Sequence, residues 1–163
     1  MQREEFINSK RIVIKLGTNI IRNENGEVAL ARIYSFIEDI SKLVKQGKEV
    51  ILVTSGAVGL GKKKLNLDST EGEGVKQACA AIGQSRLMSF YESGFGVYDI
   101  PIAQILLTED DFSLRHKYLS LRTTMNKILE FGVVPIINQN DTVTPIMSGS
   151  VNTGMKVNFS DND

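Results

Sequence analysis

Short apolar stretches alternate with longer helix-like stretches along most of this sequence, and this alternation limits the folds open to it. Stretches rich in β-branched residues predict strands at residues 11–16, 49–53, 101–107 and 133–137. Apolar residues at helical spacing predict helices between them, at residues 29–46, 73–95 and 118–131. Strands separated by helices are joined by crossover connections and pair in parallel. The sequence therefore predicts an α/β fold, a three-layer αβα sandwich around a mainly parallel sheet.

Polar segments follow each of the predicted strands. They lie at residues 15–19, 54–57, 108–111 and 138–141. The carboxyl ends of parallel strands meet at one edge of a sheet, and ligands bind beyond that edge in open α/β sheets. We therefore expect these four segments to form one site.

The stretch from Thr54 to Lys64 places small residues between a predicted strand and a segment that can continue as a helix. Glycines let the backbone approach a ligand closely, and the N–H groups at a helix start favour negative charge. The Ser55 hydroxyl and the amides of Gly56 and Ala57 would face the same point, which predicts a site for a carboxylate or a phosphate. A glycine-rich helix start that only packs against the strand explains the stretch equally well.

Two nucleotide-binding motifs nearly fit the same stretch, but neither is complete. Residues 56–63 match a Walker A loop up to the last position, where Lys63 replaces the Ser or Thr that binds magnesium. Gly56, Gly59 and Gly61 give the spacing of a dinucleotide-binding loop in reverse. Neither motif identifies the ligand.

The composition excludes several other classes of protein. The formal net charge is 0 and there is no tryptophan, so nothing indicates a nucleic-acid or membrane surface. The single cysteine, Cys79, is predicted to pack on an apolar helix face, and the single histidine, His116, to lie at the surface. One cysteine and one histidine do not make a zinc site. A reducing cytoplasm is the simplest setting for such a chain.

Segments spread over nearly the whole chain together resemble one family of enzymes, the glutamate 5-kinases of the amino acid kinase superfamily. The matching segments are residues 14–18, 53–58, 81–88, 104–108, 134–141 and 160–163. Each segment is modest by itself, but they occur in the order of the family. The chain departs from the family pattern at Gln139, where Glu is customary, and at Ser160, where Gly is usual.

The resemblance implies an amino acid kinase-like fold and an activity. Such enzymes use ATP and Mg²⁺ to phosphorylate the γ-carboxylate of L-glutamate to glutamyl 5-phosphate, the first step of proline biosynthesis, with proline as a candidate feedback inhibitor. Residues 1–163 would be the N-terminal, glutamate-binding part, with a flexible loop or hairpin at 142–160. The nucleotide-binding half and the RNA-binding-like C-terminal domain of the family would be absent, so this chain alone is expected to be inactive.

A fold that stops before its second half is expected to expose apolar surface. No helix-like stretch follows the last predicted strand, so we expect an open sheet edge near residues 133–137 and association into a homo-oligomer.

The resemblance also implies roles for individual residues. The predicted catalytic residues are Lys15, which would stabilise the phosphoryl group in transfer, and Asp163. The predicted glutamate-binding residues are Ser55, Gly56, Ala57, Asn138, Asp141 and Asn162. The predicted ATP-binding residues are Lys15, Gly17, Thr18 and Asp161. Asp161 and Asp163 would organise the lysines and the metal, and no direct metal ligand is assigned.

Two other functions remain open at this point. Another acyl-phosphate kinase of the superfamily, such as an acetylglutamate or carbamate kinase, would use a similar lysine in its first strand. The occurrence of both motifs, residues 138–141 and residues 161–163, in one sequence argues against this alternative. A non-catalytic binding or assembly module is the alternative from a different class. Without the resemblance, Asn138 and Asp141 alone predict an Asx turn, and residues 161–163 a solvated acidic terminus.

Overall fold

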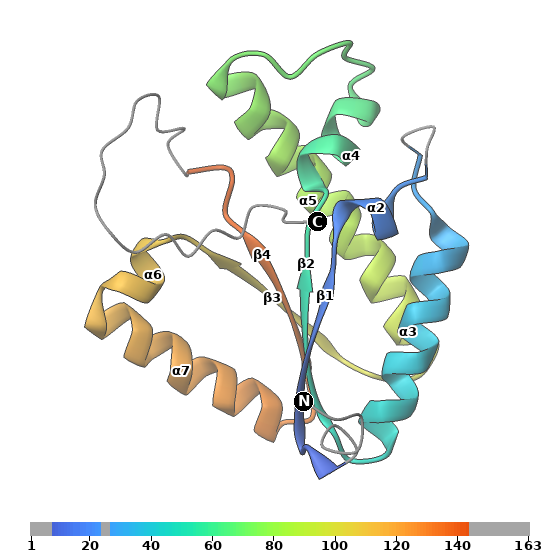
Figure 1. Cartoon of the computed structure of the whole chain (residues 1–163), viewed down its shortest axis with the longest axis vertical. Coiled ribbons are helices and arrows are strands. Elements are labelled where there is room, and N and C mark those ends of the chain that lie inside the picture. The colour runs from blue at the N-terminus through green and yellow to red at the C-terminus, as the bar shows by residue number, and fades with distance from the viewer. Residues whose placement is uncertain (1–7, 24–26, 144–163) are drawn as a thin grey trace.

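A four-stranded parallel sheet forms the centre of the computed structural model, which describes residues 8–23 and 27–143. The strands are β1 (Arg11–Leu16), β2 (Glu49–Thr54), β3 (Ile102–Leu107) and β4 (Val134–Gln139). Their order across the sheet is β1-β2-β4-β3, and every neighbouring pair is parallel. All carboxyl ends therefore point to the same side, toward the top of Figure 1.

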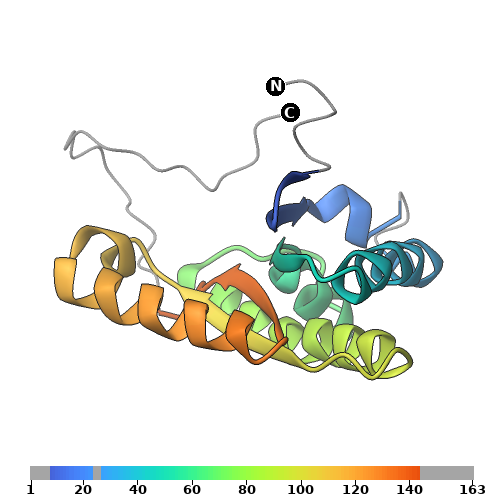
Figure 2. The same ribbon diagram turned by 90° about the horizontal axis from the view of Figure 1, so that it is seen from below.

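Helices cover both faces of this sheet. They are α2 (Thr18–Ile21), α3 (Leu30–Lys45), α4 (Ala57–Lys64), α5 (Glu73–Gly96), α6 (Asp110–Ser113) and α7 (Arg115–Glu130). The long helices α3 and α5 lie on one face and α7 lies on the other (Figures 1 and 2). The predicted αβα sandwich is confirmed. Within the described part of the chain, no helix combines the length and the apolar character needed to cross a bilayer.

The direction of the connections explains why the helices divide between the two faces. The chain moves across the sheet from β1 to β2 and on to β3, and then turns back to β4. Parallel crossovers are right-handed, so connections that run in opposite directions lie on opposite faces. The helices α3 and α5 belong to the outward connections, and α7 belongs to the return.

The expectation of an open edge near residues 133–137 is wrong. The strand β4 lies between β2 and β3, and the edges of the described sheet are β1 and β3. The return through α7 inserts the last strand into the interior. This strand is also longer than predicted, because Asn138 and Gln139 continue the ladder opposite Leu106 and Leu107 of β3.

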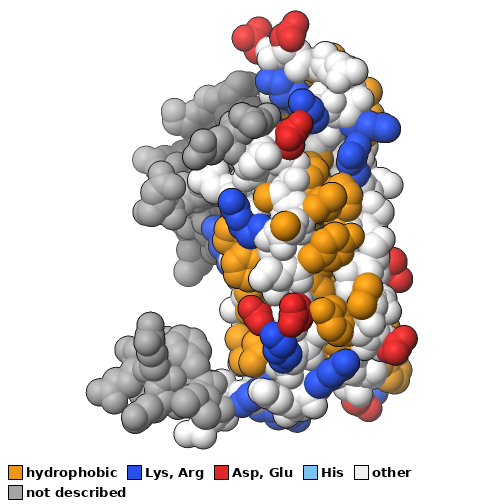
Figure 3. Space-filling model, turned by 90° about the vertical axis from the view of Figure 1, so that its right-hand side faces the viewer, with side chains coloured by type: hydrophobic (Ala, Val, Ile, Leu, Met, Phe, Trp, Pro, Cys, Tyr) orange, Lys and Arg blue, Asp and Glu red, His pale blue; other side chains and the backbone are white. Residues whose placement is uncertain are grey.

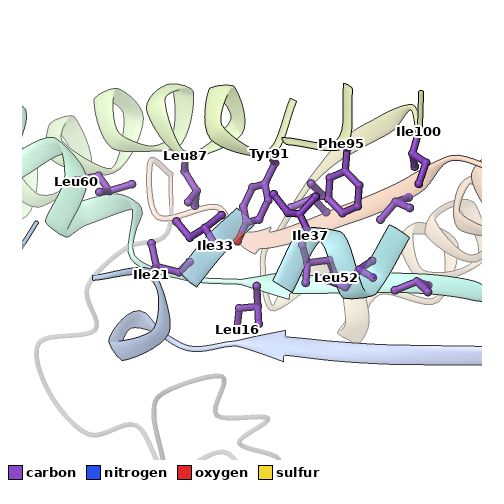
Figure 4. Packing of buried hydrophobic residues seen from close by; sticks show 14 residues of the cluster. Leu16, Ile21, Ile33, Ile37, Leu52, Leu60, Leu87, Tyr91, Phe95 and Ile100 are labelled. Carbon is purple, nitrogen blue, oxygen red and sulfur yellow. The ribbon is translucent and has the colours of Figure 1, made fainter. Parts of the chain in front are cut away.

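The hydrophobic core lies between the sheet and the helices α3 and α5. Leu87, Tyr91 and Phe95 are fully buried at successive turns of α5, and Figure 4 shows them projecting toward Ile33 and Ile37 of α3. The opposite face is covered less completely, because α7 buries only Leu129 among its residues. Most of the buried core therefore lies on the face of the sheet that α3 and α5 cover.

The outer surface of α3 carries several apolar side chains. Figure 3 shows hydrophobic atoms running along this side of the molecule, between charged groups. Leu30 and Tyr34 of α3 are among the exposed large hydrophobic residues. The expected homo-oligomer stays a prediction, because a single chain does not test it.

Candidate functional site

A pocket of about 410 Å³ lies beyond the carboxyl ends of the strands. Each strand or the segment after it contributes to the lining. The lining residues are Lys15, Thr18, Val53, Thr54, Ser55, Gly56, Ala57, Val58, Gly59, Leu107, Thr108, Glu109, Phe112, Ile137, Asn138, Gln139 and Asp141. The four polar segments that the sequence predicted to converge do meet in one place.

The pocket exists because the sheet splits at this end. The β1–β2 ladder continues to Leu16 and Thr54, whereas β2 pairs with β4 only at Leu52–Ile136 and Val53–Ile137. Beyond these pairs the chain after β2 turns into α4, and the chain after β3 turns into α6 and α7, which belong to the opposite face. Such a divergence leaves a crevice above the strand between them, where α/β sheets bind ligands.

The turn between β2 and α4 forms one side of the pocket. Gly56 has φ +92°, a left-handed conformation that favours glycine, and it lets α4 begin immediately at Ala57. The first amides of a helix have no partner within the helix, so they are available to an anion. The Ser55 hydroxyl lies 3.2 Å from the Thr18 hydroxyl and donates to the Leu16 carbonyl at 3.4 Å. The Ser55 hydroxyl and the first amides of α4 therefore lie at one turn beside the pocket, and the anion site stays a prediction.

Two glycines hold this helix start against α5. A Cβ on Gly83 would lie 1.7 Å from the Ala57 carbonyl oxygen, and a Cβ on Gly61 would lie 1.9 Å from the Cys79 carbonyl oxygen. Only a residue without a side chain allows such an approach between two helix backbones. Cys79 is fully buried at this contact, as predicted. The position of the Ala57 amide is thus set by packing against α5.

Lys15 and Thr18 form the side of the pocket that belongs to β1. Lys15 is the last residue but one of β1, it is exposed, and it pairs in register with Val53. Gly17 precedes the four-residue helix α2, which the sequence did not predict, and Thr18 begins that helix. Gly17 is not part of the pocket lining, although it sets the turn that brings Thr18 there.

The end of β4 forms the floor. Asn138 is buried, and its Nδ2 donates to Gln84 Oε1 at 2.8 Å while its Oδ1 accepts from the Gln139 N–H at 2.9 Å. Asp141 follows in the turn after the strand and is partly buried. Burial raises the pKa of this carboxyl, and the charge of Lys76 opposes the shift. A cationic group of a ligand would therefore stabilise the charged form of Asp141.

The segment after β3 forms the remaining wall. Asp111 Oδ2 accepts from both the N–H and the hydroxyl of Thr108, at 2.7 and 2.8 Å. These bonds lower the pKa of Asp111 and hold α6 at the rim. Glu109 and Phe112 line the pocket as a result. Glu109 lies in the polar segment 108–111 that the sequence predicted to join the site, although no role was assigned to it. No sequence signal pointed to Phe112.

Some predicted site residues cannot be placed. Asp161, Asn162, Asp163 and most of the expected 142–160 loop lie outside the described residues. His116 is exposed on α7, as predicted, and lies apart from this pocket. In residues 8–23 and 27–143, no group of three or more His, Cys, Asp or Glu side chains could hold a metal ion.

The Tyr91 hydroxyl anchors the end of β2 and predicts a pH dependence. It lies 2.7 Å from the Thr54 hydroxyl, and burial raises the pKa of Tyr91 to about 12. An unfolded tyrosine ionises near pH 10, so the stabilising contribution is complete below pH 10 and is lost as the pH rises toward 12. We expect a loss of about 2–3 kcal/mol in the free energy of unfolding over this interval.

Urea titrations at pH 9 to 12 would measure this loss. The Tyr91→Phe variant should show a smaller alkaline loss than the wild type, whereas Tyr118→Phe, at an exposed tyrosine on α7, should behave like the wild type. Equal alkaline losses in the wild type and in Tyr91→Phe would contradict the prediction.

Comparison with curated proteins finds glutamate 5-kinases among the relatives. The chain is 47% identical over 146 residues to a glutamate 5-kinase of Desulfotalea psychrophila, a match that covers 88% of this chain and 39% of the relative. It is 38% identical over 164 residues to a glutamate 5-kinase of Pelobacter propionicus, covering 100% of this chain and 42% of the relative. The chain spans about two-fifths of the length of these relatives.

Two further comparisons concern solved structures and family models. The chain is similar to UMP kinase from Ureaplasma parvum, with a TM-score of 0.49 and 18% identity, covering 80% of this chain and 55% of that chain. The model of the amino acid kinase family matches residues 10–155. This match includes the strands and helices named above, β1 to β4 and α2 to α7, and the whole lining of the pocket. The chain therefore belongs to the amino acid kinase family.

Proposed function

We propose that this chain is the glutamate-binding part of a glutamate 5-kinase. The observation that carries the proposal is the composition of the pocket. A hydroxyl and helix-start amides suited to a carboxylate lie on one side, and a half-buried carboxylate suited to an ammonium group lies on another. An amino acid with a side-chain carboxylate offers both partners. The names of the relatives support this choice of substrate.

The binding roles follow from the geometry of the two sides. Ser55 and the amides of Gly56 and Ala57 hold the γ-carboxylate of L-glutamate, because donors at a helix start stabilise an anion. Asp141 binds the α-ammonium group, which removes the cost of keeping that carboxylate charged in a partly buried position. Asn138 and Asn162 complete the glutamate site in this proposal.

The chemistry is the transfer of one phosphoryl group. An oxygen of the γ-carboxylate attacks the γ-phosphorus of ATP, the bond from that phosphorus to the bridging oxygen breaks, and ADP leaves with the electron pair. The product is the acyl phosphate glutamyl 5-phosphate. A carboxylate is already deprotonated, so no general base is required. Lys15 stabilises the negative charge on the transferring oxygens, and positioning supplies most of the remaining rate enhancement.

ATP and Mg²⁺ are the expected co-substrate and metal. Gly17 and Thr18 supply donors near Lys15 for the phosphates, and Asp161 and Asp163 belong to the same proposed set. Among the described residues no three His, Cys, Asp or Glu side chains form a metal cage, and Mg²⁺ in such enzymes is usually held by one or two carboxylates together with substrate phosphates and water. A place in proline biosynthesis, a cytoplasmic location and proline as a candidate feedback inhibitor belong to the same proposal.

The proposal predicts that a neutral residue at position 141 weakens the binding of L-glutamate but not that of ATP. In the protein at its full natural length, Asp141→Asn should raise the KM for L-glutamate roughly 10- to 100-fold, because a hydrogen bond to a charged group contributes about 1.5–3 kcal/mol. The KM for ATP should change less than about twofold. Asp68→Asn, at an exposed aspartate outside the pocket, is the matched control.

Steady-state kinetics with hydroxylamine trapping of the acyl phosphate would measure these constants. N-acetyl-L-glutamate, whose nitrogen carries no positive charge, separates this proposal from an acetylglutamate kinase. Turnover of N-acetyl-L-glutamate in preference to L-glutamate would overturn the proposed substrate. An unchanged KM for L-glutamate in Asp141→Asn would remove Asp141 from the ammonium site.

A further inference from the structure

Two buried amide side chains meet directly behind the floor of the pocket. Gln84 of α5 and Asn138 of β4 are 8% and 6% exposed, and Asn138 Nδ2 donates to Gln84 Oε1 at 2.8 Å. Asn138 lines the pocket, whereas Gln84 does not. The contact joins residues that are 54 positions apart in the sequence.

The position of this contact along β4 is significant. The ladder between β2 and β4 ends at Ile137, and Asn138 is the next residue. From that point β4 retains its ladder with β3 on one side and has lost β2 on the other. The hydrogen bond that Asn138 donates to Gln84 therefore supports the strand where the sheet splits, three residues before Asp141.

The pair also carries an energetic cost. Gln84 Nε2 is buried and has no hydrogen-bond partner among the described residues. Burying an amide donor without a partner is unfavourable, and an apolar side chain at position 84 would avoid it. Local costs of this kind concentrate at functional sites, where a specific geometry is needed.

We propose that Gln84 is a positioning residue of the pocket. It holds Asn138, and through Asn138 it fixes the distance between the end of β4, which carries Asp141, and the Ser55–Ala57 turn. Gln84 itself does not touch the ligand. The effect on L-glutamate rests on the proposed function, whereas the effect on the end of β4 does not.

Amide hydrogen exchange tests the positioning without any ligand. In Gln84→Leu, the amides of Gln139 and Asn140, which bond to Asn138 Oδ1 and the Leu107 carbonyl, should exchange about tenfold faster or more. The amides of Val134 and Ile136 should exchange at the wild-type rate. The Gln84→Glu variant keeps an oxygen that can accept from Asn138 and should restore slow exchange at Gln139.

Affinity for L-glutamate tests the consequence in the protein at its full natural length. Gln84→Leu should raise the KM for L-glutamate roughly 10- to 100-fold, as expected for a misplaced binding group. The KM for ATP should stay within about twofold of wild type. Gln77→Leu, two helical turns earlier on α5 and outside the pocket, should leave both constants unchanged.

A double-mutant cycle shows whether Gln84 acts through Asn138. If it does, Gln84→Leu with Asn138→Leu should raise the KM for L-glutamate no further than the larger single effect, because coupled residues are not additive. If the increases in KM of the two single variants multiply in the double variant, Gln84 acts through a residue other than Asn138. If Gln84→Leu does not fold, Gln84→Met provides the same comparison with a more flexible apolar side chain.

The two proposals fail in different ways. Wild-type exchange rates at Gln139 and Asn140 in the folded Gln84→Leu variant would overturn the positioning role, whatever the ligand. A wild-type protein without turnover of L-glutamate would overturn the proposed function, and the exchange rates would then decide about Gln84 alone.

Discussion

Replacing Lys15 by alanine in the protein at its full natural length should lower kcat roughly 100- to 1,000-fold, as happens when a donor that stabilises transition-state charge is removed. Lys15 lies at the end of β1, exposed on the rim of the pocket, opposite the segment after β3. The oxygens around the transferring phosphoryl group carry more negative charge in the transition state than in the bound substrates. The loss of Lys15 should therefore appear mainly in kcat. Lys15→Arg should not restore the rate, because a planar guanidinium differs from a compact ammonium group.

The stability of the Lys15→Ala variant should change little. An exposed side chain away from the core contributes within about 0.5 kcal/mol, so thermal melts of variant and wild type should nearly coincide. Lys64→Ala, at an exposed lysine on the far end of α4, should leave both kcat and stability unchanged. A normal kcat for Lys15→Ala would exclude Lys15 from the reaction and would weaken the assignment of the kinase activity.

Replacing Gly83 by alanine should disrupt the pocket from outside it. The new Cβ would lie 1.7 Å from the Ala57 carbonyl oxygen and 2.7 Å from the Gly61 amide nitrogen, so α4 and α5 must move apart. Overpacking of this kind costs roughly 1–3 kcal/mol. For a domain of this size the melting temperature should fall by roughly 2–12 °C. The displaced Ala57 amide should also weaken binding of L-glutamate more than tenfold, a loss of about 1.4 kcal/mol.

Gly74→Ala on the same helix is the matched control. No atom lies within 4 Å of a Cβ at Gly74, so alanine there should be neutral or stabilise the helix by up to about 1 kcal/mol. Differential scanning calorimetry and isothermal titration with L-glutamate measure both effects. A Gly83→Ala variant with wild-type melting temperature and affinity would show that the tight contact between α4 and α5 is not required.

The local elements could be predicted because their signals lie within a few residues. The apolar run before Gly17 and the spacing of Ile33, Ile37 and Ile40 are enough to predict β1 and α3. The turn between β2 and α4 was likewise predicted from its small residues, whereas the left-handed conformation of Gly56 was not. The short helix α2 was missed, because four residues contain too little periodicity to detect.

The convergence of the site could also be predicted, but its contacts could not. Parallel strands place Lys15, Ser55 and Asp141 at one end of the sheet whatever the strand order. The hydrogen bond between Gln84 and Asn138 joins positions with no common local pattern, so no spacing rule predicts it. Phe112 reaches the pocket only because α6 is held at its rim, where Asp111 bonds to Thr108.

The sequence by itself determined the strands, the long helices and the end of the sheet at which the site lies, because these depend on periodicity and on residues adjacent in the chain. The tertiary structure alone decided that β4 lies inside the sheet, that the sheet splits beyond Val53 and Ile137, and that Gly83 brings Ala57 to its position. These features depend on the order and packing of segments far apart in the chain. Their free energy comes from contacts that exist only after the layers have assembled.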